Sequence, residues 1–422
     1  MRQFPFPDRP RLWGVAVSHY QVEGGDTCDW TAWEAAGRAH EPCGDAMGSW
    51  QRYEEDAALA ASLGSNAFRF SVSWSRVEPE PGRWDDEALA RYRRLVDRLE
   101  ALGLEPIVTL FHYTHPAWFH ERTPWTSPRS VDAFTRFAAR TAEALGPAVR
   151  LYTVLNEPLV SVLGGYLDAR IPPGLSDAGA ARKALDHMLA AHAASAAAIR
   201  ERNPGAAIGI AHNVMGFAPC RPRHPLDRWL ARKGHRFYNL ALPEAFLTGR
   251  LDLRLPGMDL RSRRPELVGS LDVLGVNYYS RLHLRCPGRR RFLGDFGYED
   301  RSGRGLTDLG WEVVPELLTE LLLELAPLGL PMLITENGLA DASDARRAEY
   351  LREHVAAVLE AERSGAPVSG YLHWSLLDNF EWLEGYAPRF GLVEVDRSTM
   401  ARRPRPSAEV FRELGADYLS RP

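Results

Sequence analysis

The segment Thr153-Val-Leu-Asn156-Glu157-Pro158 is the clearest indication of how this chain folds, because an apolar run with branched side chains stops there at a polar pair and a proline. Such a run predicts a buried β-strand that ends at a loop. Far along the chain, Leu333-Ile-Thr335-Glu336-Asn337-Gly338 repeats the pattern and stops at Asn-Gly. Each glutamate is therefore expected at the C-terminal end of its own strand.

Similar short apolar runs occur along the whole chain and alternate with longer segments of helical periodicity. The predicted strands are Leu12–Ala16, Ala67–Ser71, Pro106–His112, Leu151–Glu157, Ala207–His212, Leu274–Tyr279, Pro331–Glu336 and Gly370–Ser375. The predicted helices are Trp50–Leu63, Asp86–Leu102, Val131–Leu145, Ala181–Asn203, Trp311–Leu325 and Ala345–Arg363. Repeated alternation predicts an α/β fold with parallel strands, and eight such units predict a (β/α)8 TIM barrel. A doubly wound open sheet is the alternative, although no Gly-x-Gly-x-x-Gly follows the first strand.

The domain organisation follows from what the sequence lacks as well as from its length. A chain of 422 residues would allow two or three domains, but α/β barrels often reach such lengths as one domain. No linker, low-complexity tract or fixed repeat is visible, so residues 1–422 are expected to form a single domain. The Arg-rich stretch Arg281–Arg304 is expected to form a long excursion at the barrel mouth.

The composition argues against several classes of partner. The net charge is -4 and no long run of like charges occurs, so nothing indicates nucleic acid or an anionic membrane surface. Prolines interrupt the first residues where a signal peptide would need an apolar core, and no apolar stretch is long enough to span a bilayer. A cytoplasmic location is therefore expected. Four separated cysteines are expected to stay reduced: Cys28, Cys43, Cys220 and Cys286.

The two glutamates suggest a chemistry once they are placed in a barrel, because functional residues gather there at the C-terminal ends of the strands. Hydrolysis of a glycosidic bond needs one acid to protonate the leaving oxygen and one carboxylate to meet the sugar carbon. A lone Asn-Glu-Pro segment is more often only a solvated end of a strand. The pairing of Glu157 with Glu336 favours a glycosidase.

Eight motifs, in order, resemble glycoside hydrolase family 1, a group that includes many β-glucosidases. They are Trp13-Gly-Val-Ala-Val-Ser-His-Tyr-Gln-Val-Glu-Gly24, Phe68-Arg-Phe-Ser-Val-Ser-Trp-Ser-Arg76, Thr109-Leu-Phe-His112, Leu155-Asn-Glu-Pro158, Gly275-Val-Asn-Tyr-Tyr-Ser280, Thr335-Glu-Asn-Gly338, Trp374-Ser-Leu-Leu-Asp-Asn-Phe-Glu-Trp382 and Arg389-Phe-Gly-Leu392. The resemblance covers nearly the whole chain. It implies a retaining β-glycosidase, most simply a β-glucosidase that tolerates glucosides, fucosides and galactosides and works through a covalent glycosyl-enzyme intermediate.

The resemblance also assigns the chemistry to particular residues. It implies that Glu157 is the general acid/base and Glu336 the nucleophile, so Glu157 must carry a proton near neutral pH while Glu336 is ionised. Retention predicts carboxyl groups about 5–5.5 Å apart, against about 6.5–9.5 Å for an inverting pair. Arg69 and Tyr279 are expected to hold Glu336 charged and oriented, with Asn277 beside them.

Recognition of the sugar is likewise implied by the resemblance. Hydrogen-bonding side chains are expected from Gln21, His112, Asn156, Asn277 and Glu381, and an apolar wall from Trp374, Trp382 and Phe390. Trp311 resembles a residue on the aglycone side, although at the start of a predicted helix it is equally compatible with packing. A carboxylate at Glu381 would repel a phosphate, so a non-phosphorylated sugar is expected.

Some features depart from the family pattern or stay open. Tyr113-Thr114-His115 follow His112 where the family usually has Trp-Asp, which leaves the choice among glucose, galactose and fucose open. His112, His115 and His120 fit no standard zinc spacing, so neither a metal nor a cofactor is expected. The expected partner is a small β-glycoside or an oligosaccharide; the natural aglycone and the oligomeric state are not predicted. A transglycosylase and a catalytically silent sugar-binding barrel remain as alternatives.

Overall fold

A computed structural model describes residues 4–6, 8, 11–255, 258–286 and 295–421. Within these ranges eight parallel strands close into a barrel, in the order β10-β11-β1-β2-β3-β4-β5-β8, with a further pairing between β10 and β8. They are β1 (Leu12–Ala16), β2 (Ala67–Ser71), β3 (Glu105–Phe111), β4 (Leu151–Asn156), β5 (Ala207–Pro219), β8 (Val273–Arg285), β10 (Met332–Asn337) and β11 (Val368–Trp374). The predicted (β/α)8 barrel is confirmed, and each predicted strand is present.

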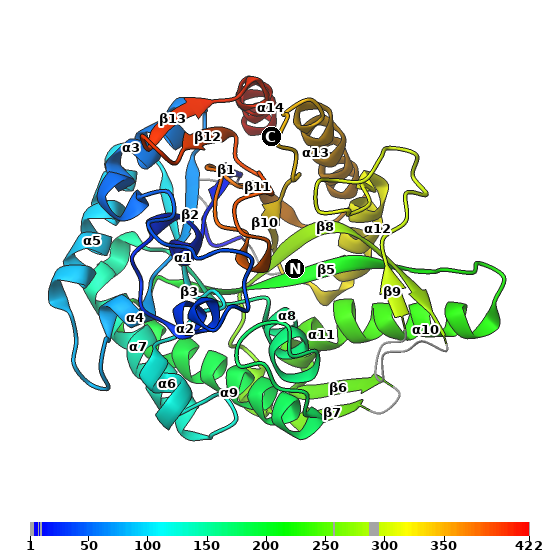
Figure 1. Ribbon diagram of the computed structural model, residues 1–422, viewed down its shortest axis with the longest axis horizontal. Helices are drawn as coiled ribbons and strands as arrows, with labels where there is room; N and C mark the ends of the chain where they lie inside the picture. Colours follow the sequence, from blue (N-terminus) through cyan, green and yellow to red (C-terminus); the bar gives the residue numbers. More distant parts are fainter. Residues whose placement is uncertain (1–3, 7, 9–10, 256–257, 287–294, 422) are drawn as a thin grey trace.

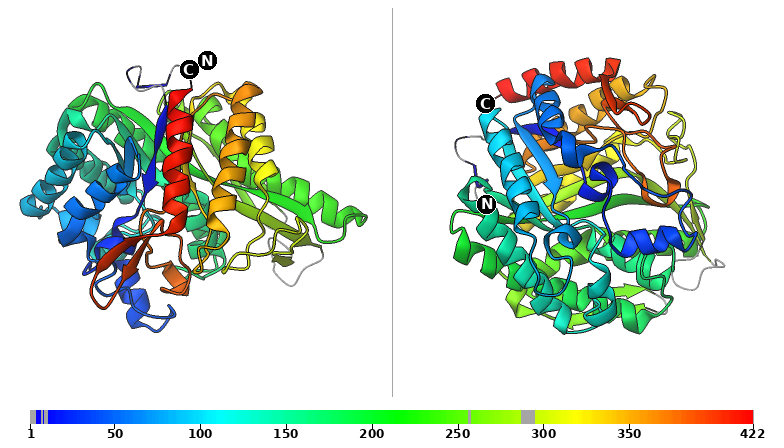
Figure 2. Two further views of the ribbon diagram at one scale, coloured as in Figure 1. Left: turned by 90° about the horizontal axis from the view of Figure 1, so that it is seen from above. Right: turned by 60° about the vertical axis from the view of Figure 1, so that its left-hand side comes forward.

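Long helices surround the barrel (Figure 1), and α13 and α14 lie side by side on its outside (Figure 2). They are α3 (Ser49–Ser62), α5 (Asp86–Ala101), α7 (Arg129–Leu145), α9 (Ala178–Arg202), α12 (Pro315–Leu325), α13 (Arg347–Arg363) and α14 (Pro406–Ser420). The predicted start of one helix was wrong, because α12 begins at Pro315 and Trp311 lies in the loop before it. Proline suits the first turn of a helix, where its missing N–H costs no hydrogen bond.

Shorter elements fill the connections and were not predicted. The other helices are α1 (His19–Glu23), α2 (Asp29–Ala35), α4 (Trp74–Val77), α6 (Ala117–Arg122), α8 (Pro158–Val162), α10 (Pro225–His235) and α11 (Ala241–Thr248). Single 3-10 or π turns are η1 (Gly146–Ala148), η2 (Leu163–Leu167), η3 (Arg236–Leu240), η4 (Pro265–Leu267), η5 (Ala326–Leu328) and η6 (Trp382–Glu384). The remaining strands are β6 (Arg250–Leu255), β7 (Met258–Arg263), β9 (Asp295–Gly297), β12 (Val393–Asp396) and β13 (Ala401–Pro404).

Two apolar clusters hold the barrel together. The larger packs the helices against the strands; in α7, for example, Phe134, Phe137 and Ala138 recur at helical spacing and are fully buried. The smaller includes Ala67 on β2 and Ile107 on β3. Ala67 shares the face of β2 that carries Arg69, since alternate residues of a strand point the same way. This second cluster therefore lies on the inner face of the barrel and supports the polar residues above it.

Two strands continue well beyond the barrel. β5 and β8 remain paired from Gly209 with Val273 to Pro219 with Leu284, and β9 adds an antiparallel strand to the end of β8. The predicted ends at His212 and Tyr279 were therefore too early. The start of the predicted Arg281–Arg304 excursion continues β8 as far as Arg285, whereas residues 287–294 lie outside the described residues. In Figure 1 the two strands run outward from the ring above α10.

Candidate active site

Glu157 lies where β4 ends and α8 begins. Its backbone is left-handed, with φ 47° and ψ 56°, and Pro158 opens α8 directly after it. A residue other than glycine in this conformation is strained, and such strain clusters at functional positions. The side chain lines a cavity at the mouth of the barrel.

Glu336 lies near the end of β10 and lines the same cavity. A close approach requires the glycine that follows, because a Cβ on Gly338 would lie 1.7 Å from the carbonyl oxygen of Trp374. Asn337 donates from Nδ2 to the backbone carbonyl of Tyr278 at 2.7 Å, which ties β10 to β8. The Asn-Gly pair therefore fixes the strand end that carries Glu336.

Arg69 and Tyr279 both contact the carboxylate of Glu336. Arg69 donates from Nη1 to Oε1 at 2.6 Å, and the Tyr279 hydroxyl donates to Oε2 at 2.8 Å. Arg69 is only 1% exposed, so its charge needs a partner inside the protein. Both contacts favour the ionised form of Glu336.

Two asparagines connect this group to Glu157. Asn277 donates from Nδ2 to Glu157 Oε1 at 2.7 Å and to Asn156 Oδ1 at 3.3 Å, and Asn156 Oδ1 also accepts from Arg69 Nη2 at 2.6 Å. Asn213 of β5, which was not predicted, donates to Glu157 Oε1 at 3.0 Å. One hydrogen-bond network thus links the two carboxyl groups.

The electrostatics of the pair follow from burial. Burial raises the pKa of Glu336 to about 7, and the nearby Glu157 adds to the shift, while Arg69 and Tyr279 oppose it. A second carboxylate close by makes ionisation of Glu336 harder, because like charges repel. The pair therefore retains a proton at a pH at which a free glutamate has lost it, as an acid catalyst needs.

The cavity has a volume of about 880 Å³ and collects most of the predicted residues. Those that line it are Gln21, His112, Glu157, Tyr279, Trp311, Glu336, Trp374, Glu381, Trp382 and Phe390. Arg69, Asn156 and Asn277 are buried beneath it and reach it through the hydrogen bonds above. Burial, together with the charge of Arg69, holds the pKa of His112 well below its usual value. His112 is thus neutral and offers a sugar both a donor and an acceptor.

The aromatic residues form one side of the cavity. Trp374 stacks with His112 at a centroid distance of 5.9 Å, and Trp382 stacks on Tyr20 at 5.8 Å. Phe390 and Trp311 lie 6.2 Å apart. Trp311 therefore takes part in the cavity wall from its loop, and not from a helix.

The sequence predicts a charged carboxylate at Glu381, whereas its surroundings in the structure favour the neutral acid. Gln21 donates from Nε2 to Glu381 Oε2 at 3.3 Å. Burial raises the pKa of Glu381 to about 8, and the neighbouring Glu336 and Glu157 add to the shift. The predicted repulsion of a phosphate therefore applies fully only above about pH 8. At pH 7 most of this side chain is a neutral acid that can donate as well as accept.

Tyr113 contacts Glu157 and was missed as a site residue. Its hydroxyl donates to Glu157 Oε2, the oxygen that Asn277 and Asn213 leave open. Its backbone has φ 70°, so two strained non-glycine residues meet through their side chains. Burial raises the pKa of Tyr113 well above its usual value, which keeps the hydroxyl protonated as a donor. The sequence marked this position only as a departure from the family tryptophan.

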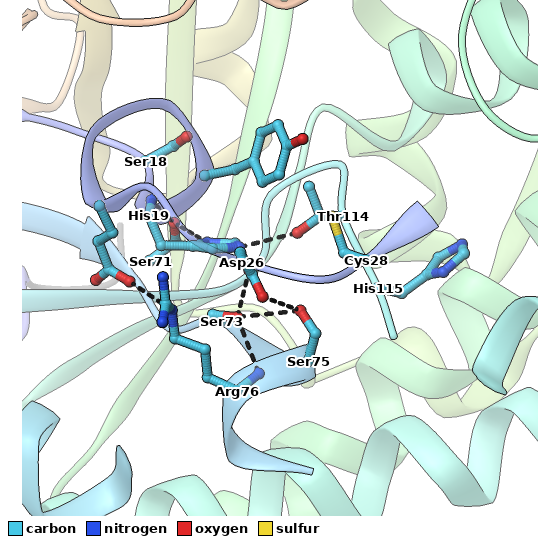
Figure 3. Close-up of polar contacts among 12 residues, drawn as sticks. Ser18, His19, Asp26, Cys28, Ser71, Ser73, Ser75, Arg76, Thr114 and His115 are labelled. Atoms are coloured by element: carbon cyan, nitrogen blue, oxygen red, sulfur yellow. Dashed lines mark hydrogen bonds and ion pairs between the residues drawn. The ribbon is translucent and has the colours of Figure 1, made fainter. Parts of the chain in front are cut away.

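Buried polar groups form hydrogen bonds to Thr114 and His115, which follow Tyr113 in its loop (Figure 3). His19 Nε2 lies 2.9 Å from Thr114 Oγ1, and its Nδ1 lies 2.8 Å from Ser71 Oγ. The backbone N–H of His115 donates to Asp29 Oδ1 at 2.9 Å. Burial lowers the pKa of His19 to about 4, so this histidine is a neutral support. The cluster also contains Asp26, which accepts hydrogen bonds from Ser73 and Ser75.

The four cysteines of the chain are Cys28, Cys43, Cys220 and Cys286, and all are free thiols. Among the described residues, no group of three or more His, Cys, Asp or Glu side chains could hold a metal ion. No helix in the described ranges has the length and apolar character needed to cross a membrane.

Comparison with known proteins gives the family of the chain. The profile of Glycosyl hydrolase family 1 matches residues 3–417. The β-galactosidase of Pyrococcus woesei is 31% identical, over 98% of this chain and 97% of its own. The bifunctional β-D-glucosidase/β-D-fucosidase of Bifidobacterium breve is 30% identical, over 97% of this chain and 98% of its own.

A solved structure extends the similarity to the fold. The β-glycosidase from Pyrococcus horikoshii superposes with a TM-score of 0.90 at 34% identity, covering 99% of this chain and 96% of the other. These relatives do not favour the silent barrel or the transglycosylase as the main activity. The chain belongs to glycosyl hydrolase family 1 and is a retaining β-glycosidase.

Proposed function

We propose that Glu157 is the general acid/base and Glu336 the nucleophile of this enzyme, acting on β-glycosides. The observation that carries the proposal is the arrangement of the two carboxyl groups in one cavity, with Glu336 contacted by a guanidinium and Glu157 only by neutral donors. A nucleophile must be charged, and the acid must hold a proton. The proposed separation of about 5–5.5 Å leaves no room for a water between carboxylate and sugar carbon.

In the first step Glu336 attacks the anomeric carbon while Glu157 gives its proton to the leaving oxygen. Arg69 and Tyr279 orient the attacking carboxylate before the bond forms. The negative charge on Glu336 disappears on glycosylation, so the carboxylate of Glu157 no longer faces a like charge and is available as a base. In the second step Glu157 takes a proton from water, and the water releases the sugar with its original configuration.

The proposed sugars are glucosides, fucosides and galactosides. The B. breve relative is named for activity on glucosides and fucosides, and the P. woesei relative for activity on galactosides. Gln21, His112 and Glu381 supply both donors and acceptors to the ring hydroxyls, which supports tolerance of more than one pattern. Trp374 and Trp382 provide the apolar face against which a pyranose ring packs.

The test compares the turnover of two variants on glycosides with two kinds of leaving group. Glu336→Ala should lose turnover of every glycoside, because no covalent intermediate can form. Glu157→Ala should lose alkyl glycosides by about 10²–10⁴-fold but retain far more activity on dinitrophenyl glycosides, whose leaving group needs no proton. Equal losses on both substrates would contradict the acid role. NMR of the first product should show the β-anomer; an α-anomer would overturn both assignments.

A further inference from the structure

We infer that the part of the cavity beyond Glu157 binds a large apolar aglycone in preference to a second sugar; this inference rests on the proposed function. The cavity of about 880 Å³ is near the upper end of the roughly 300–1,000 Å³ typical of ligand sites. One pyranose ring between Glu336 and Glu381 leaves much of it unfilled. The remainder, called here the aglycone chamber, is bounded by β5, β8, β9, α8, η2 and η3.

The strands that continue beyond the barrel form the first wall of the chamber. Met215 and Phe217 follow Asn213 at alternate positions of β5, Leu282 and Leu284 lie on β8, and Phe296 of β9 pairs with Leu284. Alternate residues of a strand share a face, so these side chains give the wall a continuous apolar surface.

The other face of β8 carries the polar residues. Arg281 donates to both carboxylate oxygens of Glu312, at 2.7 and 2.8 Å, and His283 lies 3.7 Å from the same carboxylate. The Ser280 hydroxyl, although it borders the cavity, donates to the backbone carbonyl of Glu312 at 2.8 Å. The strand thus sends its charged groups outward and its leucines inward.

Two helical segments form the facing walls. Val160, Leu163 and Leu167 lie on α8 and η2, and Phe237 and Tyr238 lie on η3. Three of these five side chains are aliphatic, and two are aromatic. Hydrocarbon groups pack against all of them equally well.

Two polar side chains inside the chamber are engaged with each other and with the catalytic cavity, and the Tyr298 hydroxyl is a third polar group there. The Tyr238 hydroxyl donates to Asn213 Oδ1 at 2.7 Å, and Asn213 donates onward to Glu157. Among the described lining residues, the charged groups on this side, Asp168, Arg170, Asp308 and Glu384, are exposed at the rim. A second sugar carries more hydroxyl groups than Tyr298 can partner and would bury the others unpaired, which is unfavourable, whereas an alkyl, alicyclic or aromatic group would not.

The experiment measures kcat/KM of the wild-type enzyme for methyl, butyl, hexyl and octyl β-glucosides below their micelle concentrations, and for cellobiose. The leaving alcohols have similar acidity, so differences in the series report contacts with the chain. Each added methylene should raise kcat/KM by two- to fourfold, where fourfold corresponds to ~0.8 kcal/mol per buried methylene. Octyl glucoside should exceed cellobiose by at least about tenfold.

A pair of variants locates the effect. Leu282→Gln places an amide in the chamber wall and should lower the ratio of octyl to methyl glucoside turnover by about tenfold. Leu226→Gln is the matched control, because Leu226 is 49% exposed on α10 and does not line the cavity. It should leave the ratio unchanged.

The outcomes separate this inference from the proposed function. A flat alkyl series, or faster turnover of cellobiose than of octyl glucoside, would overturn the apolar chamber while leaving the glycosidase intact. Loss of the chain-length dependence in both variants would also overturn it. Failure of the wild-type enzyme to turn over even dinitrophenyl glucoside would instead contradict the proposed function.

Discussion

Tyr113 gives Glu157, the proposed acid/base residue, a contact that the family resemblance does not supply. Its hydroxyl donates to Glu157 Oε2, and such a bond favours the ionised carboxylate. Tyr113→Phe should therefore move the basic limb of the kcat/KM profile to higher pH by about one unit, since a hydrogen bond to a charged group contributes ~1.5–3 kcal/mol. Deglycosylation should slow, because the basic form of Glu157 is needed there.

A pH profile distinguishes this role from simple packing. Tyr53→Phe is the control, since it removes a hydroxyl on α3 that is not part of the active-site cavity. It should leave the profile in place. An equal fall in rate at every pH for Tyr113→Phe would mean that the tyrosine only packs.

Among the residues of the active site, the sequence predicted those that belong to recognisable motifs and missed those that do not. Glu157, Glu336 and Arg69 lie in short segments with a recognisable order, and all are found at the site. Asn213 was missed because its place in the site depends on how far β5 continues. Tyr113 was missed because its place depends on a left-handed backbone. Neither property has a signature in neighbouring residues.

The end of β10 carries Glu336, the proposed nucleophile. Gly338→Ala should destabilise the protein by about 3 kcal/mol or more and lower kcat, because the new Cβ would collide with the carbonyl of Trp374. Gly297→Ala in β9 is the matched control, since a Cβ there meets nothing within 4 Å. Urea denaturation and kcat of both variants test this; similar behaviour of the two would contradict the close approach.

Strand centres were predictable, and strand ends were not. The β1 and β2 boundaries agree with the predictions residue for residue, because each strand is a short apolar run between breakers. β5 and β8 continue because they pair with each other beyond the ring, a tertiary contact that local pattern does not encode. The start of α12 was misplaced because the apolar Trp311 fits the helical period of the residues after Pro315.

Holding three carboxyl groups in one cavity lowers the free energy of unfolding of the whole protein as the pH rises. Burial raises the pKa of Glu381 to about 8, against an ordinary value of 4.5, so the folded state binds this proton more tightly than the unfolded chain. The free energy of unfolding must then fall as pH rises from about 4.5 through about 8. Below the lower value both states are protonated, and the contribution is constant.

Glu381→Gln should remove this dependence. The variant should be more stable than wild type by about 1–3 kcal/mol at pH 8.5 and nearly equal to it at pH 4.5. Glu320→Gln, which changes an exposed carboxylate on α12 away from the cavity, serves as the control. Urea titrations at the two pH values measure both variants. The same gain for Glu381→Gln at both would assign the effect to packing instead of charge.

The extended β5 and β8 strands separate the molecule into parts that can evolve at different rates. The groups proposed to break the bond stand on strand tips within the ring, where each is hydrogen-bonded to several others. Leu282, Leu284 and Phe217 stand outside the ring, on backbone whose pairing does not depend on side-chain identity. Mutations there can exchange one leaving group for another while the reaction itself stays under selection. A lineage with this architecture can diversify its substrates without rebuilding its catalyst.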